Sequence, residues 1–372
     1  MPNDRRSLHI VHTEASCGWG GQEIRILEES RGLIARGHRV TILAPAESTI
    51  FQRASEWGVT SIALPLVKKR LGPLLALRGW LKAHAHDVDL INTHSSTDSW
   101  LAALAVRMAS PRLPIVRTRH ISAPVHASAA NRWLYATAAA HVVTTGEQLR
   151  RELIDNLGVR PDASTSIPTG MDTTRYLPGN KVMARAQLGL DVDAYWIGIV
   201  ATLRSWKGHT YLLEALTQLP DPRMRLLIVG QGPQREALGQ KVRELGLEAR
   251  VHFAGEQKNV VPWLQALDVF ALPSYANEGV SQAVMQAMLV GLPIVTTPVG
   301  SMRDIIENRH TGLIIAPKNA GQLADAIESL HADPGAAQLL GERARTFALE
   351  HCSLTRMLDR MEAIFLGAAR PR

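Results

Sequence analysis

The chain has 372 residues, of which 46% are hydrophobic and 20% charged, and its formal net charge is +7. This composition is that of a soluble globular protein and excludes fibrous and intrinsically disordered classes, and the length predicts two domains. The only two cysteines, Cys17 and Cys352, lie far apart without metal-ligand spacing, which argues against a disulfide framework and a structural zinc site.

Short runs rich in β-branched residues alternate with amphipathic stretches along the whole chain. In the first half we expect strands at His9–Thr13, Val40–Ala44, Asp89–His94, Pro114–His120 and Val142–Thr145. In the second half we expect strands at Trp196–Ala201, Arg225–Val229, Val251–Phe253, Val269–Pro273, Ile294–Thr297 and Leu313–Ala316. Apolar strands that alternate with helices predict parallel sheets covered on both faces. The expected fold class is therefore α/β, with two doubly wound domains.

Pro178 and Gly179 interrupt the helical pattern in the segment MDTTRYLPGN, before a new helix begins at Lys181. We place an N-terminal domain at residues 1–175, a C-terminal domain at residues 181–350, and a last helix at residues 353–368 that can pack back on the N-terminal domain. Ligands of open parallel sheets bind beyond the carboxyl ends of the strands. We therefore expect the functional site in a cleft between the two domains.

The segment GWGGQE, residues 18–23, follows the first strand and opens a helix. Glycines allow the backbone to approach a phosphate closely, and the start of a helix supplies unpaired N–H groups and a partial positive charge. The segment matches neither G-x-G-x-x-G nor a Walker loop. It therefore predicts either a phosphate site or a plain tight turn.

Two basic residues follow the first strand of the second half, in VATLRSWKGH. Arg204 and Lys207 are three residues apart, so both can reach one diphosphate, the arginine as a fork and the lysine as a point charge. An enzyme that expels a nucleoside diphosphate without a metal needs such cations to hold the developing charge. The alternative is a solvated basic loop.

In EGVSQAVMQAMLVGLP, Glu278 precedes a predicted helix and Gln286 lies eight residues later, about two turns and ~12 Å along that helix. Both side chains can therefore point at one extended ligand. A carboxylate at a helix start is also an ordinary capping group, and the residues alone leave that alternative open.

Together, the motifs resemble the retaining family 4 glycosyltransferases of GT-B fold. The resemblance rests on GWGGQE, VATLRSWKG, LLIVGQGP, VHFAGEQKNVVPWLQALDVFALPS and EGVSQAVMQAMLVGLPIVTTPVGSMRDII, and SIPTGMDTTRYLP is similar to their interdomain segment. It covers Leu8 to about Ala316, and the order of motifs is specific for the family but not for a substrate. It implies two Rossmann-like domains that face each other across a cleft, a nucleotide-sugar donor on the second domain, an acceptor on the first, and transfer with retention that uses neither metal nor cofactor.

The resemblance also assigns roles to single residues. The residues implied to bind the donor are Gly20, Gly21, Arg204, Lys207, Glu256, Asn259, Glu278, Gly279, Val280, Ser281 and Gln286. Arg204 and Lys207 would hold the diphosphate, Glu278 the hydroxyls of the donor sugar, and Gln286 the ribose. Glu256 and Asn259 would lie near the base, and Gly20 and Gly21 at the donor phosphate. The implied catalytic set is Glu278, His120, Arg204 and Lys207, with His94 and Trp19 as acceptor-side candidates.

The chain departs from the family pattern at two positions. Gln286 stands where the family usually has a second Glu, and Thr202 stands where the phosphate loop usually has its first basic residue. An amide oxygen still accepts a hydrogen bond from a ribose hydroxyl, but without charge assistance, so we expect a loss of roughly 1 kcal/mol, or about fivefold in affinity. Arg204, two residues after Thr202, can supply the missing cation.

The segment DVDL, residues 87–90, is similar to the D-x-D motif of metal-dependent transferases. It opens a predicted strand of the first domain whose run continues apolar, so we expect no metal site there. No nucleic-acid-binding module occurs, although the basic excess would permit one.

The first 180 residues hold 21 Lys and Arg against 15 Asp and Glu, so most of the net charge belongs to the first half. The stretch Val67–Val88 places leucines and Trp80 among Lys68, Lys69 and Arg70, and a basic amphipathic helix of this kind can lie on an anionic membrane. The alternative is a helix packed on its own sheet with solvated lysines. The start of the chain lacks a signal-peptide core and no apolar window spans a membrane, so we expect a cytoplasmic protein, with peripheral contact to the inner face of the membrane.

These observations predict a glycosyltransferase that moves a sugar from a nucleotide-sugar donor to a hydroxyl of a cell-envelope glycan or lipid-linked acceptor. Among such acceptors, lipopolysaccharide is the one we expect first. One alternative is a sugar-nucleotide epimerase or hydrolase, which would consume the donor without an acceptor. The other is a degenerate GT-B protein that binds a partner but catalyses nothing, which Gln286 and Thr202 suggest.

Overall fold

The computed structural model describes residues 6–120, 125–276 and 278–369, and the chain divides into two compact units. The first unit joins the chain up to Gly170 with the segment from Leu354 onward, and the second runs from Met171 to Ser353. The C-terminal helix thus belongs to the same unit as the first half of the chain. The two-unit α/β architecture follows the alternation of strands and helices in the sequence.

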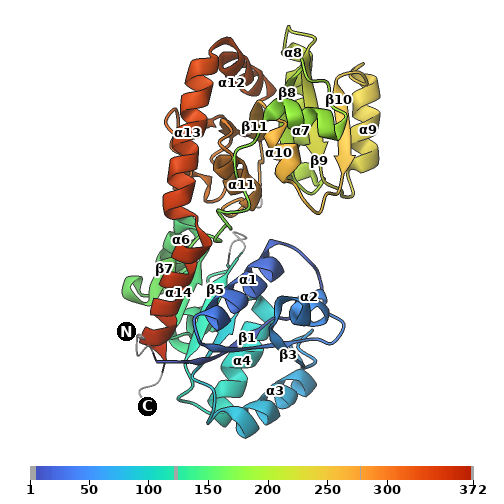
Figure 1. Cartoon of the computed structure of the whole chain (residues 1–372). Helices are drawn as coiled ribbons and strands as arrows, with labels where there is room; N and C mark the ends of the chain where they lie inside the picture. Colours follow the sequence, from blue (N-terminus) through green and yellow to red (C-terminus); the bar gives the residue numbers. More distant parts are fainter. Residues whose placement is uncertain (1–5, 121–124, 277, 370–372) are drawn as a thin grey trace. The chain divides into compact units, whose positions relative to one another are not determined.

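The first unit is built on a parallel sheet with the strand order β3-β2-β1-β4-β5-β6-β7 (Figure 1). Its strands are β1 His9–Thr13, β2 Arg39–Ala44, β3 Thr60–Ala63, β4 Leu90–Thr93, β5 Ile115–Arg119, β6 His141–Thr144 and β7 Ser164–Ser166. Its helices are α1 Gly21–Ala35, α2 Thr49–Arg53, α3 Leu71–His84, α4 Ser96–Ala109, α5 Ala129–Arg132, α6 Glu147–Leu157 and α14 Leu354–Ala368, with short turns η1 Ala54–Trp57, η2 Trp133–Ala138 and η3 Pro161–Ala163. Two hydrophobic clusters fill the space between this sheet and its helices.

The second unit has a parallel sheet with the order β10-β9-β8-β11-β12-β13. Its strands are β8 Tyr195–Val200, β9 Met224–Val229, β10 Val251–Gly255, β11 Val269–Leu272, β12 Ile294–Thr296 and β13 Leu313–Ile314. Its helices are α7 Lys181–Leu188, α8 His209–Gln218, α9 Arg235–Glu244, α10 Val261–Gln265, α11 Gln282–Val290, α12 Ala320–Ala332 and α13 Pro334–His351, with turns η4 Ser205–Lys207 and η5 Met302–Asp304. A single continuous core joins both faces of this sheet to its helices.

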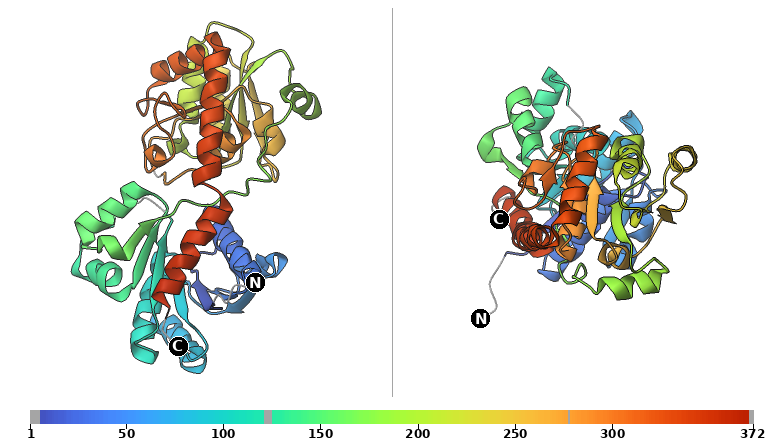
Figure 2. Two further views of the ribbon diagram at one scale, coloured as in Figure 1. Left: turned by 60° about the vertical axis from the view of Figure 1, so that its left-hand side comes forward. Right: turned by 90° about the horizontal axis from the view of Figure 1, so that it is seen from above.

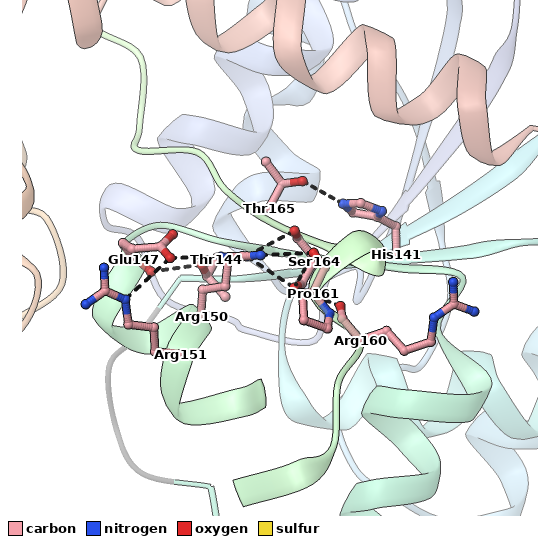
Figure 3. Close-up of polar contacts among 10 residues, drawn as sticks. His141, Thr144, Glu147, Arg150, Arg151, Arg160, Pro161, Ser164 and Thr165 are labelled. Carbon is pink, nitrogen blue, oxygen red and sulfur yellow. Dashed lines mark hydrogen bonds and ion pairs between the residues drawn. The ribbon is translucent and has the colours of Figure 1, made fainter. Parts of the chain in front are cut away.

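The sequence analysis missed β3 and β7, which are the two edge strands of the first sheet. Both are short, and β7 has the sequence Ser-Thr-Ser, so neither carries the apolar run that marks a central strand. Side chains from the neighbouring elements hold β7 in place (Figure 3). Arg150 on α6 donates to the carbonyl oxygens of Ser164 and Pro161 at 3.0 and 2.9 Å, and His141 of β6 hydrogen-bonds Thr165 at 2.9 Å.

Helix α14 packs on α1 of the first unit (Figure 2). Met361 and Phe365 are fully buried, and a Cβ at Gly32 of α1 would lie 2.3 Å from Leu358, so glycine is required for this close approach. Glu362 accepts hydrogen bonds from Arg36 and His38 at 2.6 and 3.0 Å. The apolar stripe of α14 therefore completes the core of the first unit. None of the helices that the structure describes is long and apolar enough to cross a membrane.

Candidate functional site

The loop that follows β8 carries the basic pair of the second unit, and a neighbouring loop fixes its backbone. The N–H of Leu203 donates to the carbonyl of Gln231, and the N–H of Gln234 donates back to Leu203, both at 3.0 Å. A Cβ at Gly232 would lie 2.7 Å from the backbone of Leu203, so only glycine allows the two loops to pack this closely. These contacts fix the position of Leu203, where the loop that carries Arg204 and η4 begins.

Lys207 and Glu278 form an ion pair at the carboxyl edge of the six-stranded sheet. The lysine Nζ lies 2.5 Å from Oε1 of Glu278, and the hydroxyl of Ser274 donates to the same oxygen at 2.6 Å. Glu278 is only 4% exposed, whereas the side chain of Lys207 is 20% exposed. The fold thus brings together two residues that are 71 positions apart, and the side chain of Lys207 is the more exposed of the two.

Gly300 supports the backbone beneath Glu278. It has a φ of 64°, and a Cβ there would lie 2.0 Å from the carbonyl oxygen of Glu278. The N–H of Ser301 also donates to the carbonyl of Gly279 at 3.3 Å. The segment from Glu278 to Ser281 therefore packs against the loop that follows β12.

Glu278 to Ser281 lead directly into helix α11. Ser281 is the N-cap residue, and its side chain makes no capping hydrogen bond. The first N–H groups of a helix have no partner within the helix, and they favour negative charge beside them. Together with Lys207, this helix start is suited to a phosphate group. Gly279 and Val280 lie at the same edge, as the resemblance implies for backbone contacts.

Arg204 is exposed on the same loop as Lys207, with its guanidinium 5.4 Å from the centre of the Trp206 ring. Thr202 is also exposed, and its carbonyl accepts the N–H of Arg204 at 2.7 Å. The indole face supports the arginine without neutralising it, since a cation over an aromatic ring keeps its full charge. Arg204 can therefore turn its fork toward an anion bound near Lys207.

Gln286 lies on α11, two turns after Glu278, and its amide nitrogen donates to the hydroxyl of Tyr176 at 3.1 Å. Its amide oxygen then points away from that hydroxyl and can accept a bond from a ligand. Sequence reasoning did not find Tyr176, because nothing in the motif MDTTRYLPGN distinguishes a tyrosine that contacts the site from one that only fills the core.

Glu256 and Asn259 follow β10 and are both exposed. Asn259 accepts the N–H of Val261, the first residue of α10, at 3.2 Å. These residues lie beyond the carboxyl end of their strand, as do Arg204, Lys207 and Glu278 beyond theirs. A separate cavity of about 600 Å³, lined by Tyr195, Asp268 and Pro293, lies at the opposite edge, where the strands begin, so we do not assign it to this site.

In the first unit, Gly20 is the N-cap residue of α1 and Gly21 begins the helix. Trp19 is 38% exposed and lies under the guanidinium of Arg53, 4.2 Å from the ring centre. The carboxylate of Glu14 closes this loop: it accepts the N–H groups of Ala15 and Ser16 at 2.8 and 2.7 Å. The start of the glycine loop is therefore fixed by hydrogen bonds to the carboxyl group of Glu14, which the motif analysis overlooked.

Burial, with a smaller contribution from the neighbouring carboxyl of Asp98, raises the pKa of Glu14 to about 8. Asp98 caps helix α4, where it accepts the N–H groups of His94 and Ser95 at 2.8 and 2.7 Å. Burial also raises the pKa of Asp98. Each of these two buried carboxyl groups therefore binds its proton more tightly than an exposed carboxyl group does.

His94 and His120 lie together at the carboxyl edge of this sheet, and a third histidine, His12, joins them. Nδ1 of His12 is 2.8 Å from Nε2 of His94, and Nδ1 of His94 is 2.9 Å from Nε2 of His120. Burial lowers the pKa of His12 to about 3 and holds those of His94 and His120 well below the usual value. Sequence reasoning found two of these three histidines and missed His12, which lies inside an apolar strand.

The two carboxylates of the DVDL segment are used within the fold. Asp87 pairs with Arg39, and Asp89 accepts the N–H of His9 at 2.8 Å and a guanidinium N–H of Arg6 at 3.0 Å. Both lie before β4, at the edge of the sheet opposite to the histidines. Within residues 6–120, 125–276 and 278–369, no group of three histidine, cysteine, aspartate or glutamate side chains is arranged to hold a metal ion.

Two parallel-sheet α/β units, with a cation pair, a buried glutamate and a helix start at one strand edge, define a glycosyltransferase fold of the GT-B class. The chain belongs to the group 1 glycosyltransferases: residues 181–347 match the family described as "Glycosyl transferases group 1", and residues 19–175 match "Glycosyltransferase Family 4". The resemblance inferred from the motifs is thus confirmed, and so is the fold class.

A D-inositol 3-phosphate glycosyltransferase of Nocardia farcinica is 29% identical over 283 residues, which cover 69% of this chain and 61% of that protein. The match thus spans about three fifths of that relative's length. Among solved structures, Anabaena HepE in complex with UDP-glucose has a TM-score of 0.82 at 24% identity, covering 97% of this chain and all of that one. WaaG, a glycosyltransferase involved in lipopolysaccharide biosynthesis, has a TM-score of 0.71 at 17% identity, covering 96% and 100%. These structural likenesses show a shared fold.

Proposed function

We propose that this protein transfers a sugar from a nucleotide-sugar donor to a hydroxyl group of an acceptor. The observation that carries the proposal is the pairing of Lys207 with the buried Glu278 beside the start of α11. This arrangement combines a cation and helix N–H groups for a diphosphate with a fixed carboxylate for sugar hydroxyls. The donor therefore binds at the carboxyl edge of the six-stranded sheet.

In the proposed reaction, the acceptor oxygen forms a bond to the anomeric carbon while the bond from that carbon to the diphosphate oxygen breaks. The leaving diphosphate takes up the acceptor proton, and Lys207 and Arg204 stabilise the charge that develops on it. Glu278 orients the sugar, and the amide oxygen of Gln286 accepts from a ribose hydroxyl. No step requires a metal ion, and retention of the anomeric configuration is part of the proposal.

The nucleotide panel for the first experiment begins with UDP and UDP-glucose, which are bound in the HepE structures. We expect calorimetric titration of the purified protein with UDP, GDP, ADP and their common sugar conjugates to show binding of one nucleotide family. The reason is that Lys207, Arg204 and the start of α11 recognise the shared diphosphate, while the loops after β9 and β10 select the base. Absence of binding across the whole panel would contradict the proposal.

The titration, together with incubation of the donor without an acceptor, distinguishes the two alternatives. An epimerase or hydrolase would bind the donor and consume it in the absence of any acceptor, which chromatography of the nucleotide products detects. A degenerate protein would bind no nucleotide with useful affinity, because Gln286 and Thr202 would have weakened the site beyond use. The intact Lys207–Glu278 pair favours the transferase over this second alternative.

For the acceptor, we propose a lipid-linked glycan of the cell envelope, with lipopolysaccharide as the first example. The likeness to WaaG supports this choice at the level of the fold, whereas the names of the relatives favour a second candidate, an inositol phosphate. What distinguishes the two is a membrane-facing surface, since a lipid-linked acceptor lies in a bilayer and an inositol phosphate does not. The proposed location is cytoplasmic, at the inner face of the membrane.

Helices α3 and α4, which pack on each other, provide such a surface. The inner side of α3 buries Leu77 and Leu81, whereas Leu71 is 68% exposed and Leu75 46% exposed. We use the name α3–α4 face for the exposed residues of these two helices and of the segment before α3, which also include Val67, Lys68, Lys69, Arg70, Lys82, Leu104, Arg107 and Met108. Apolar side chains among cations are suited to the interface of an anionic membrane.

We expect the Lys68→Ala/Lys69→Ala/Arg70→Ala variant to bind anionic vesicles about a hundredfold more weakly than the wild-type protein. Each basic residue near an anionic surface contributes about 1 kcal/mol, so three together give an effect of this order. Co-sedimentation with phosphatidylglycerol vesicles measures it. A matched control removes three exposed charges of the second unit, Arg243, Arg303 and Arg343. Equal sedimentation of both variants would remove the α3–α4 face from the proposal.

A further inference from the structure

The hydroxyl of Tyr176 and the amide of Gln286 join two segments of the second unit that are far apart in the sequence. Nε2 of Gln286 lies 3.1 Å from the tyrosine oxygen, and the two residues are 110 positions apart. Among the residues that the structure describes, no other group hydrogen-bonds the side chain of Gln286. What holds this amide on the protein side is therefore Tyr176.

Tyr176 is held firmly by its own surroundings. It is 7% exposed and belongs to the hydrophobic core of the second unit. Before it in the chain, Asp172 accepts the N–H and the hydroxyl of Thr174 at 2.9 and 2.7 Å. After it, Gln265 of α10 donates to the carbonyl of Leu177 at 2.8 Å. A tyrosine with its ring in the core presents its hydroxyl at a fixed point, since only two side-chain torsions separate that group from the backbone.

Gln286 lies in the middle of α11, and its side chain is half-buried and flexible. Rotation about its last torsion exchanges the amide oxygen and nitrogen at almost no change in shape. The two ends differ in chemistry, because the oxygen only accepts hydrogen bonds and the nitrogen only donates them. In the structure the nitrogen faces Tyr176, so the oxygen is the end that is directed away from it. A glutamine at this position therefore needs a partner that selects one of its two orientations.

We infer that Tyr176 orients the amide of Gln286, so that the oxygen and not the nitrogen faces a ribose hydroxyl of the bound nucleotide. Tyr176 is thus a positioning residue, because it acts on the ligand through Gln286. The glutamate that the family usually has at this position needs no such partner, since both ends of a carboxylate accept. The inference rests on the proposed function, to which the contact with the ribose belongs.

The test is calorimetric titration with two nucleotides that differ only in the ribose hydroxyls. The probes are the nucleoside diphosphate that binds in the panel, UDP being the first, and its 2′,3′-dideoxy counterpart. The ratio of their dissociation constants measures what the two hydroxyls contribute. We expect Tyr176→Phe to reduce this ratio about three- to tenfold, the effect of one neutral hydrogen bond, while the dideoxy compound binds as it does to the wild-type protein. An unchanged ratio would overturn the inference.

The Gln286→Glu variant tests whether orientation is the cause. A carboxylate presents an oxygen in either orientation, so this variant should bind the ribose nucleotide about fivefold more tightly. Adding Tyr176→Phe to it should change the ratio less than about twofold, because identical ends need no orienting partner. Weaker binding by Gln286→Glu would mean that the nitrogen faces the ribose, which contradicts the inference. An equal effect of Tyr176→Phe in both backgrounds would mean that the tyrosine only packs against the side chain.

Tyr195→Phe is the control, since Tyr195 begins β8 at the opposite edge of the same sheet. It should leave both dissociation constants unchanged, and an equal reduction of the ratio there would refute a specific role of Tyr176. Phenylalanine keeps the buried ring of Tyr176, and normal binding of the dideoxy compound shows that the variant is folded. If the wild-type protein binds no nucleoside diphosphate, the proposed function fails together with the inference. If it binds one and Tyr176→Phe leaves the ratio unchanged, the inference alone fails.

Discussion

Replacing Glu278 by Gln is expected to lower turnover about a hundredfold or more, while the protein stays folded. The amide keeps the volume of the side chain, and it can still accept the hydroxyl of Ser274, which lies 2.6 Å from Oε1. It cannot hold Lys207 by charge or accept charge-assisted bonds from sugar hydroxyls. Loss of one such preorganised polar contact lowers rates by about 10²- to 10³-fold.

The measurement is the initial rate of sugar transfer at saturating donor, with Glu328→Gln as the control. Glu328 is an exposed glutamate on α12, so its substitution removes the same charge from the same unit without touching the site. A near-normal rate in the Glu278→Gln protein would remove Glu278 from the mechanism. Equal losses in both variants would assign the effect to net charge.

The Lys207→Met variant is expected to bind the nucleoside diphosphate about ten- to a hundredfold more weakly. Hydrogen bonds to charged groups contribute about 1.5–3 kcal/mol, and Lys207 is the cation that pairs with Glu278, just before the start of α11. The variant should also unfold at a lower temperature. The reason is that Glu278, 4% exposed, loses the cation of its ion pair, and removal of one member of a buried ion pair costs about 3–5 kcal/mol.

Calorimetry and thermal unfolding together separate these two effects. In the double variant Lys207→Met/Glu278→Gln the buried charge is absent, so stability should largely return while nucleotide affinity stays low. Lys241→Met is the control, since Lys241 also faces a glutamate, Glu214 at 3.6 Å, on the outer helices of the same unit. Unchanged nucleotide affinity in the Lys207→Met protein would exclude a contact between Lys207 and the diphosphate.

The central strands of both sheets could be predicted from the sequence, because a strand buried on both faces must be a continuous apolar run. Edge strands are under no such requirement, which is why β3 and β7 were missed. Arg204, Lys207 and Glu278 could be found for a related reason. Residues just beyond the carboxyl ends of parallel strands meet at one edge, so their positions along the chain already place them together.

The contacts that decide what these residues do could not be predicted in this way. Tyr176 lies 110 residues before Gln286, and His12 lies 82 before His94, and no spacing rule relates such positions. The resemblance gave Trp19 as an acceptor-side candidate, but its contact with Arg53, 34 positions later, followed from no motif. His12 lies inside an apolar strand and gave no signal, because its neighbours in sequence are those of an ordinary core residue.

By itself, the sequence determined the class of fold and the family, because these depend on periodicity and on the order of local motifs. Only the tertiary structure decided the pairing of Lys207 with Glu278, the direction of the Gln286 amide and the order of the three histidine rings. The physical reason is that a hydrogen bond or an ion pair depends on the distance and orientation of two side chains. Those are set by packing among distant segments and not by separation along the chain.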